Sequence, residues 1–234
     1  MNSVELTSLK NHSYTLTESL RALRTNIQFC GDDVKTILFT SAMPDEGKST
    51  VVMDLARSIA EADKRVLVID TDMRKSLLIG RLRAHAEGEE KIYGLSHYLS
   101  GQQSMDKVFC STNVPNLFMV FSGPSVPNPT EILEKEYFSR LIAFARDHFD
   151  YVLVDCAPIG AAIDAAVIGR KCDAAVLVVA QGQVSSRMIN SVKKQLEVSG
   201  VRILGAVMNK VNMKKNSYYG KYYGSYYGNY GNKE

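Results

Sequence analysis

Uninterrupted runs of valine, isoleucine and leucine recur along the chain, with stretches of helical periodicity between them. Such runs are typical of strands that are buried on both faces of a sheet. They predict strands at Thr36–Thr40, Val66–Ile69, Leu117–Phe121, Tyr151–Val154, Ala174–Val179 and Ile203–Val207. Helices are predicted at Ser49–Ala62, Pro129–His148, Asp164–Arg170 and Ser185–Ser199. This alternation predicts an α/β fold with a doubly wound, mainly parallel sheet.

The two ends of the chain differ from this central pattern. An apolar stripe at helical spacing, Leu16, Leu20, Leu23 and Ile27, predicts a helix before the first strand. We therefore expect three parts: an N-terminal helical segment over residues 1–30, a folded domain over 31–212 and a tail over 213–234.

The last 22 residues are rich in tyrosine and glycine and contain no aliphatic side chain after Met213. Without apolar side chains a segment cannot bury enough surface to offset the entropy of ordering, so we expect a disordered tail. Taken alone, the pattern is also typical of low-complexity sequence without a specific role. The tail holds seven of the twelve tyrosines, namely Tyr218, Tyr219, Tyr222, Tyr223, Tyr226, Tyr227 and Tyr230.

Composition excludes several classes of protein. With 45% apolar and 23% charged residues in 234, the chain is typical of a globular protein with a large core. The net charge of +3 and the lack of a polybasic run predict no nucleic-acid partner. The longest apolar run, Ala174–Ala180, is far shorter than the roughly 20 residues of a membrane helix, so no direct membrane insertion is expected. Four scattered cysteines and the absence of a signal-peptide pattern predict a cytoplasmic protein.

The segment from Ser41 to Thr50 follows a predicted strand and opens a predicted helix. Its end, Gly47-Lys48-Ser49, matches a phosphate loop, although Ala42 replaces the usual first glycine. Backbone N–H groups, the lysine and the serine hydroxyl suit a nucleotide with Mg²⁺. The nucleotide-binding residues expected here are Asp45, Glu46, Gly47, Lys48, Ser49 and Thr50, with Asn209, at the end of the last predicted strand, near the base.

Carboxylates follow two other predicted strands. Asp70 and Asp72 come after Val66–Ile69, and Asp155 comes after Tyr151–Val154. A single aspartate in such a place is often a helix cap, but three beside a phosphate loop favour phosphoryl transfer with a metal. We expect Ser49, Asp70 and Asp155 to hold Mg²⁺. By contrast, Asp32, Asp33 and Asp173 precede strands and are interpreted as solvated turn residues.

Together these motifs resemble the bacterial tyrosine kinases of the P-loop type, which are cytosolic kinases of capsule and exopolysaccharide synthesis. The likeness covers the nucleotide motifs at Ala42–Thr50, Val66–Arg74 and Tyr151–Asp155, and the tyrosine-rich tail. The family's ExxRxxR signature is matched by Glu18, Arg21 and Arg24.

The resemblance implies an ATP- and Mg²⁺-dependent enzyme that phosphorylates its own tail tyrosines. It implies that Lys48 and Ser49 hold phosphates and metal, that Asp70 or Asp72 takes the tyrosine proton, and that Asp155 binds or orients the metal. It further implies a ring of identical subunits, a membrane-bound activator that recruits the kinase to the inner face of the membrane, and an opposing tyrosine phosphatase. Two positions depart from the family pattern: Asp45 stands where glycine is common, and Cys156-Ala157-Pro158 follows the last motif.

The charged residues of the N-terminal helix allow two interpretations. At about 100° per residue, Glu18, Arg21 and Arg24 lie mostly off the apolar stripe and face solvent. They form either an ordinary surface ion pair or, as the resemblance implies, the contact with a neighbouring subunit.

A tail that leaves the nucleotide edge of the sheet reaches a neighbouring site more easily than its own. A flexible chain of 22 residues spans about 25 Å, which predicts phosphorylation in trans. Two other functions stay open. A partition or septum-positioning ATPase would share the fold, but its signature lysine is replaced by Met43. A nucleotide-gated, non-catalytic scaffold would leave the tail unmodified.

Overall fold

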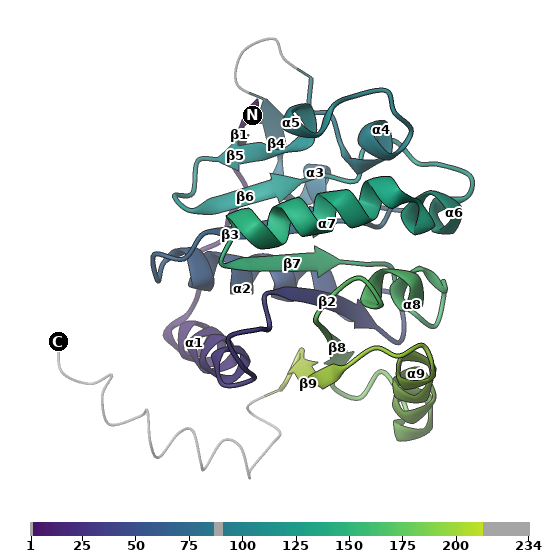
Figure 1. The fold of residues 1–234 in the computed structure, drawn as a ribbon. Coiled ribbons are helices and arrows are strands. Elements are labelled where there is room, and N and C mark those ends of the chain that lie inside the picture. Colours follow the sequence, from purple (N-terminus) through teal and green to yellow (C-terminus); the bar gives the residue numbers. More distant parts are fainter. Residues whose placement is uncertain (1, 87–90, 213–234) are drawn as a thin grey trace, which may run out of the picture.

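The six predicted strands form the parallel part of one sheet in the computed structural model, which describes residues 2–86 and 91–212. They lie in the order β6-β3-β7-β2-β8-β9 (Figure 1). Their bounds are Thr36–Ser41 (β2), Val66–Asp70 (β3), Leu117–Val120 (β6), Tyr151–Asp155 (β7), Ala174–Ala180 (β8) and Ile203–Asn209 (β9). The predicted fold class is confirmed.

Three further strands, not predicted, extend the sheet beyond β6 in the order β4-β1-β5. They are Asn2–Leu6 (β1), Ala84–Ala86 (β4) and Cys110–Thr112 (β5). The N-terminal segment is therefore helical only from Tyr14 onward. These strands are three to five residues long, and in β1 only Val4 and Leu6 bring buried apolar side chains, which is too little for a periodic pattern.

Helices cover both faces of the sheet, which explains the continuous apolar runs of the central strands. One face packs against α1 (Tyr14–Gln28), α2 (Lys48–Ala60) and α3 (Leu78–Leu82). The predicted helix Pro129–His148 is divided at Lys135, whose backbone is extended. The helices on the other face are α4 (Leu95–Leu99), α5 (Met105–Val108), α6 (Pro129–Glu134), α7 (Glu136–His148), α8 (Asp164–Gly169) and α9 (Ser186–Val198).

Parallel pairing at the centre of the sheet aligns the ends of the motif-bearing strands. Asp70, the last residue of β3, pairs in register with Asp155, the last residue of β7. On the other side of β7, Phe39 of β2 pairs with Asp155. Strand β2 ends two residues after Phe39, at Ser41, and leads directly into the phosphate loop. The register therefore brings all three nucleotide motifs to one edge, where ligands bind in open α/β sheets.

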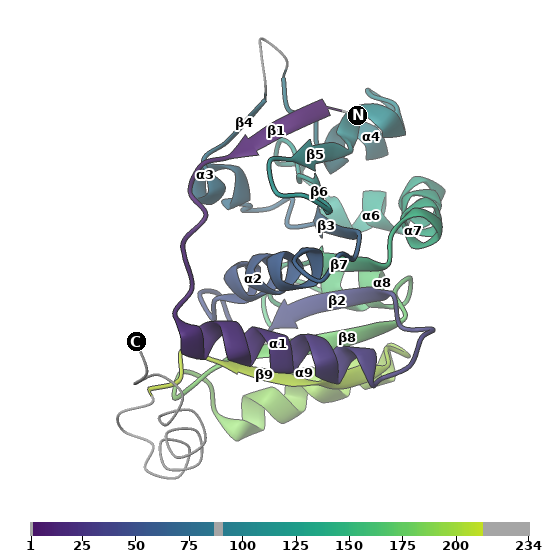
Figure 2. The ribbon, with the colours of Figure 1, turned by 90° about the vertical axis from the view of Figure 1, so that its left-hand side faces the viewer.

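The connection between β1 and α1 crosses the molecule beside α2 and α3 (Figure 2). The Ser8 amide donates to the Leu82 carbonyl at 3.1 Å. The Lys10 carbonyl accepts from Arg57 Nη1 at 2.8 Å, and His12 Nε2 lies 2.9 Å from Asp54 Oδ1.

Throughout the described ranges, every helix is too short or too polar to span a bilayer. The predicted tyrosine-rich tail lies outside the described residues.

Candidate functional site

The phosphate loop takes backbone conformations that few residue types adopt. Asp45 has φ 63° and Gly47 has φ 83°. Aspartate tolerates the left-handed region better than most residues do, which explains how Asp45 can stand where glycine is common. Helix α2 begins at Lys48 with Gly47 as its N-cap, so no side chain caps this terminus. Its first N–H groups are therefore left for an anion.

Two of the predicted nucleotide-binding residues, Glu46 and Asn209, support the phosphate loop through hydrogen bonds. The Glu46 side chain is buried: Oε2 accepts from the Met43 amide at 2.8 Å and Oε1 from the Ala180 amide at 3.0 Å. Asn209 Nδ2 donates to the Glu46 carbonyl at 2.8 Å. The expectation that Asn209 touches the base differs from this arrangement, in which its amide supports the loop. A Cβ on Gly47 would lie 2.2 Å from Asn209 Nδ2, so any larger residue would displace the Asn209 amide and strain the left-handed backbone.

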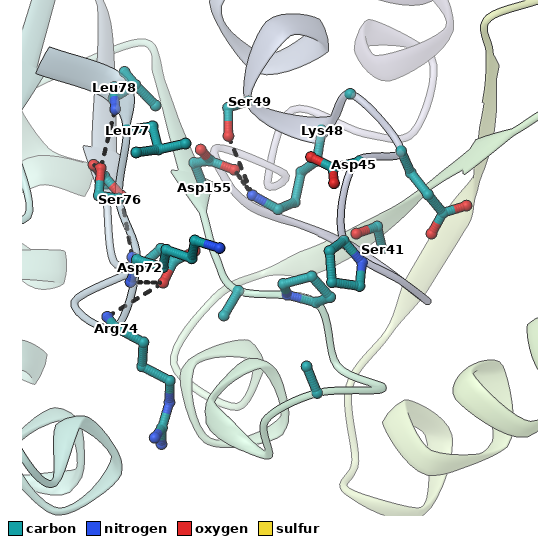
Figure 3. A pocket seen from close by; sticks show the side chains of 18 of the residues that line it. Ser41, Asp45, Lys48, Ser49, Asp72, Arg74, Ser76, Leu77, Leu78 and Asp155 are labelled. Atoms are coloured by element: carbon teal, nitrogen blue, oxygen red, sulfur yellow. Dashed lines mark hydrogen bonds and ion pairs between the residues drawn. The ribbon is translucent and has the colours of Figure 1, made fainter. Parts of the chain in front are cut away.

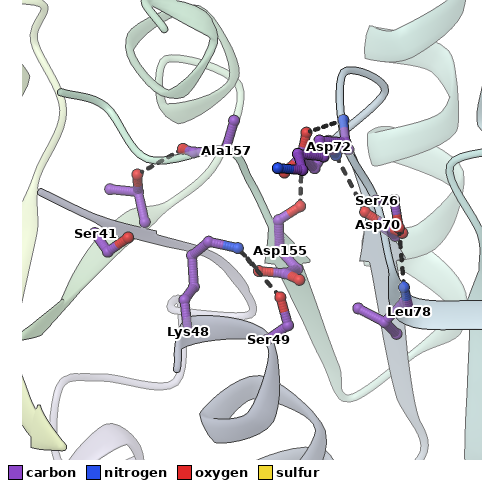
Figure 4. A network of polar contacts seen from close by, with 12 residues as sticks. Ser41, Lys48, Ser49, Asp70, Asp72, Ser76, Leu78, Asp155 and Ala157 are labelled. Atoms are coloured by element: carbon purple, nitrogen blue, oxygen red, sulfur yellow. Dashed lines mark hydrogen bonds and ion pairs between the residues drawn. The ribbon is translucent and has the colours of Figure 1, made fainter. Parts of the chain in front are cut away.

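A lysine–aspartate ion pair occupies the centre of the site (Figure 4). Lys48 Nζ contacts Asp155 Oδ1 and lies 3.3 Å from Ser49 Oγ. Both partners are buried, with side chains 8% and 1% exposed. Burial disfavours the charged ammonium, but the adjacent Asp155 carboxylate outweighs it and raises the pKa of Lys48. The lysine therefore stays charged and is held against the third nucleotide motif, at the end of β7.

Asp70 lies beside this pair, and within the described residues it forms no ion pair. Its Oδ1 accepts from the Asp72 amide at 3.1 Å, and its Oδ2 accepts from the Ser76 hydroxyl. Burial, and then the negative charge of Asp155, raise the pKa of Asp70 to about 7. The Asp70 carboxyl therefore resists ionisation.

Asp72 occupies a different position on the loop after β3. Its side chain is partly exposed and lines the cavity, and its Oδ1 accepts from the Arg74 and Lys75 amides at 3.3 and 3.0 Å. The two carboxylates of this motif therefore differ: Asp70 is enclosed by protein, and Asp72 faces the open side.

An ion pair that was not predicted from the sequence anchors this loop to the start of helix α8. Arg74 Nε and Nη2 donate to Asp164 Oδ2 and Oδ1 at 2.9 and 3.1 Å. Thr130 Oγ1 also donates to the same carboxylate, which is 2% exposed. Burial opposes the ionised carboxylate, but the bonds from Arg74 and Thr130 prevail and lower the pKa of Asp164. The only sequence signal was an aspartate at the start of a predicted helix, which is also typical of a cap.

A cavity of about 270 Å³ opens between the phosphate loop and the loops after β3 and β7 (Figure 3). Of the predicted nucleotide-binding residues, Thr50 and Asn209 are not part of its lining, and Thr50 faces a second cavity described below. The charged and hydroxyl residues of the lining are Ser41, Asp45, Glu46, Lys48, Ser49, Asp70, Asp72, Arg74, Lys75, Ser76, Arg81 and Asp155.

The donor set suits a magnesium nucleotide rather than a tightly held metal. No cluster of three or more His, Cys, Asp or Glu side chains suited to a metal occurs within residues 2–86 and 91–212. The predicted set of Ser49, Asp70 and Asp155 offers one hydroxyl and two carboxylates at adjoining strand ends. Mg²⁺ is commonly bound by one or two carboxylates together with substrate phosphates and water. These residues therefore fit a metal that arrives with a nucleotide.

The sequence predicted that the charged residues of α1 mostly face solvent. In the structure, one of the three is bonded to a neighbouring helix. Glu18 and Arg21 form an i,i+3 ion pair at 2.6 Å. Arg24 instead donates to the Ser58 carbonyl and so ties α1 to α2.

The interpretation of Asp173 as a solvated turn residue was wrong. Its side chain accepts from the Lys35 and Thr36 amides at 3.0 and 2.8 Å and is mostly buried.

Comparison with known proteins agrees with this geometry. A family model described as an AAA domain matches residues 34–216. The tyrosine-protein kinase CpsD of Streptococcus pneumoniae is 45% identical over 201 residues, which cover 86% of this chain and 87% of CpsD. The tyrosine-protein kinase etk of Escherichia coli strain K12 is 32% identical over 211 residues, covering 89% of this chain but 28% of etk.

Solved structures show the same likeness. The kinase domain of the Escherichia coli tyrosine kinase ETK superposes with a TM-score of 0.76 at 33% identity, covering 84% of this chain and 77% of that domain. The septum site-determining protein MinD of Pyrococcus horikoshii, solved with Mg-ADP, superposes with a TM-score of 0.62 at 20% identity over 78% of this chain and 72% of MinD. The latter likeness extends to the fold alone.

Proposed function

Because the chain belongs to the family of the tyrosine-protein kinases CpsD and Etk, we propose that it transfers the γ-phosphoryl group of ATP to tyrosines of its own C-terminal tail. The convergence of Lys48, Asp70, Asp72 and Asp155 on one cavity beside an uncapped helix terminus is the observation that carries this proposal. The acceptors are the seven tyrosines between Tyr218 and Tyr230, which lie outside the described residues.

The phosphate loop supplies the binding groups. The first N–H groups of α2 and the Lys48 ammonium bind the phosphates, and Ser49, Asp70 and Asp155 hold Mg²⁺. When bound, the metal neutralises charge on the phosphates. In the present structure Asp155 is the anionic partner of Lys48. A bound phosphate would therefore replace that carboxylate as the partner of the lysine, and Asp155 would be available as one of the residues that hold the metal.

Asp72 is the better-placed general base. A base must come within about 3 Å of the tyrosine hydroxyl proton, directly or through one water. Asp72 is partly exposed to the cavity, whereas the oxygens of Asp70 accept bonds from Ser76 and the Asp72 amide, and Asp70 is 1% exposed. The tyrosine oxygen forms the new bond to phosphorus as the bond to the β-phosphate oxygen breaks. ADP leaves, and Asp72 takes the hydroxyl proton.

The reaction is tested with purified protein, ATP and Mg²⁺, followed by mass spectrometry of the C-terminal peptide. Phosphate on the tail tyrosines is expected, and Lys48→Met should abolish it. To test the trans route, a Lys48→Met chain is mixed with an active chain that lacks residues 213–234. Phosphorylation of the Lys48→Met tail supports transfer between subunits; an unmodified tail in that mixture, with activity on the intact chain, shows transfer within one subunit.

The cellular role follows from the family resemblance. The kinase forms a ring of identical subunits through Glu18, Arg21 and Arg24 of the N-terminal segment, residues 1–30. It is cytoplasmic, is recruited to the membrane by a membrane-bound activator, is opposed by a tyrosine phosphatase and regulates capsule or exopolysaccharide synthesis. Each phosphate adds about −1.5 to −2 charges, so tail phosphorylation should loosen the ring by repulsion. Light scattering before and after full phosphorylation measures this, and an unchanged oligomer mass contradicts it.

The two rival functions predict different products. A septum-positioning ATPase would release phosphate without modifying its tail. A scaffold would bind ATP but would neither release phosphate nor modify the tail. The tail peptide therefore distinguishes all three, because only the kinase leaves phosphotyrosine on it.

A further inference from the structure

A second cavity, of about 390 Å³, adjoins the first. Its lining residues come from the connection between β1 and α1, the start of α1, helix α2 and helix α3. Ser49, Leu78 and Arg81 line both cavities, so a ligand in the second cavity would lie next to the site of phosphoryl transfer. Its volume falls within the range of about 300–1,000 Å³ that is common for small-molecule sites.

The polar part of this cavity carries an excess of positive charge. Lys10, Arg57 and Arg81 contribute three cations, and Asp54 contributes the one carboxylate, which is engaged by His12 at 2.9 Å. Within the described part of the chain, none of these three cations forms an ion pair. Arg57 uses Nη1 for its bonds to the Lys10 carbonyl and His12, which leaves other guanidinium donors available. The cavity therefore suits an anion.

The other part of the lining is apolar. Met53, Leu78 and Leu82 contribute buried side chains, 5%, 4% and 7% exposed, and Leu9 and Leu16 complete the lining. A free phosphate would leave this surface without a contact, whereas a ligand with an aromatic ring and an anionic group would use both parts. Phosphotyrosine has this combination.

Resting on the proposed function, we propose that the second cavity binds the side chain of a phosphotyrosine that neighbours the tyrosine being modified. The tail presents its tyrosines as adjacent pairs, Tyr218–Tyr219, Tyr222–Tyr223 and Tyr226–Tyr227. A first phosphate on the tail would then hold the segment beside the reaction site. Phosphorylation of one tyrosine would thereby favour phosphorylation of the next.

Binding is tested by calorimetry with phenyl phosphate as the probe, on the full chain saturated with ADP and Mg²⁺ to block the phosphate loop. Lys10→Glu reverses a charge on an exposed side chain and should weaken binding about tenfold. Lys64→Glu makes the same charge change beyond the other end of α2 and should have no effect. Equal affinities of the wild type and Lys10→Glu, or absence of binding, would overturn the proposal.

Inorganic phosphate tests the apolar part of the lining. Under the same conditions it should bind the wild type at least tenfold more weakly than phenyl phosphate does, because it cannot contact Met53 and Leu82. Equal binding of the two probes would contradict an aryl site and leave an adventitious anion as the explanation.

A kinetic comparison links the cavity to catalysis. The peptide KYYGSYYG, taken from the tail, is offered unmodified and with one tyrosine phosphorylated. The phosphorylated peptide should have a KM about fivefold lower with the wild type, and the ratio of the two KM values should approach one with Lys10→Glu. Equal KM values in the wild type would refute the inference while the kinase assignment stands. If neither peptide is phosphorylated, the proposed function fails, and phenyl phosphate binding alone decides the cavity.

Discussion

The buried carboxyl of Asp70 leads to a specific prediction about how the free energy of unfolding depends on pH. This carboxyl is 1% exposed and lies in register beside Asp155. The nearby Lys48 forms its ion pair with Asp155 and not with Asp70. Burial and the charge of Asp155 raise its pKa to about 7, whereas an aspartate in an unfolded chain titrates near 3.9. Replacing it with asparagine keeps the shape and removes the ionisation.

The sign and size of the effect follow from this difference. Between about pH 4 and pH 7, Asp70 is ionised in the unfolded chain and protonated in the folded protein. The folded state then binds more protons, so this group lowers stability as the pH rises through that window, and its effect levels off above pH 7. At about 1.4 kcal/mol per pKa unit, the cost is about 1–2 kcal/mol at pH 5 and at most about 4 kcal/mol at pH 8. Asp70→Asn should therefore stabilise the protein, and more so at pH 8.

The assay is urea unfolding at pH 5 and pH 8 in EDTA, followed by far-ultraviolet circular dichroism because the chain has no tryptophan. The gain in the free energy of unfolding of Asp70→Asn over the wild type should be about 2–3 kcal/mol larger at pH 8 than at pH 5. Asp147→Asn, which removes an exposed carboxylate, should show no such difference. If Asp70→Asn and the wild type depend on pH in parallel, Asp70 is ionised in the folded protein and the reasoning from burial is wrong.

Three other substitutions test the supports of the site. Asp164→Asn should lower the free energy of unfolding by about 1–3 kcal/mol and reduce kcat with little change in the KM for ATP, because Arg74 loses its carboxylate partner; an unchanged kcat would show that the pair does not position the loop. Gly47→Ala should cost about 1–3 kcal/mol, and Asn209→Ala in the same chain should recover part of it by removing the clash; strictly additive costs would contradict this. Glu46→Gln should cost about 1–3 kcal/mol in urea unfolding, since an amide can accept only one of the two N–H bonds; unchanged stability would argue against this support.

The central strands were predictable because their local sequence carries the whole signal. A strand covered by helices on both faces needs apolar side chains on both, as the fully buried β2 and β8 show. The placement of Asp70 and Asp155 was predictable for the same reason, since each directly follows such a run and parallel strands end at one edge. The short strands β1, β4 and β5 carry no comparable pattern, and they become strands only by pairing with distant segments.

The hydrogen bonds that support the site could not be predicted from local sequence, because each joins residues that are far apart in the chain. Glu46 contacts the Ala180 amide across 134 positions, and Asn209 reaches the loop across 163. A carboxylate and an amide next to a phosphate loop suggest nucleotide ligands in the sequence, which does not reveal that they also support the loop. The contact of Arg24 was equally hidden: its guanidinium donates to the Ser58 carbonyl of α2, a bond that the motif did not predict, and its role at a subunit interface stays a prediction.

The charge arrangement explains why these supports matter. With Lys48 and Asp155 paired and both buried, the structure has already removed the key charges of the site from water. A phosphate that displaces Asp155 thus exchanges one anionic partner of the lysine for another, and the cost of desolvating the lysine is not incurred again on binding. Such an exchange requires the loop to keep its shape while the carboxylate is released. Glu46, Asn209 and the Arg74–Asp164 pair hold the surrounding backbone independently of Lys48, so the site can change partners without changing its framework.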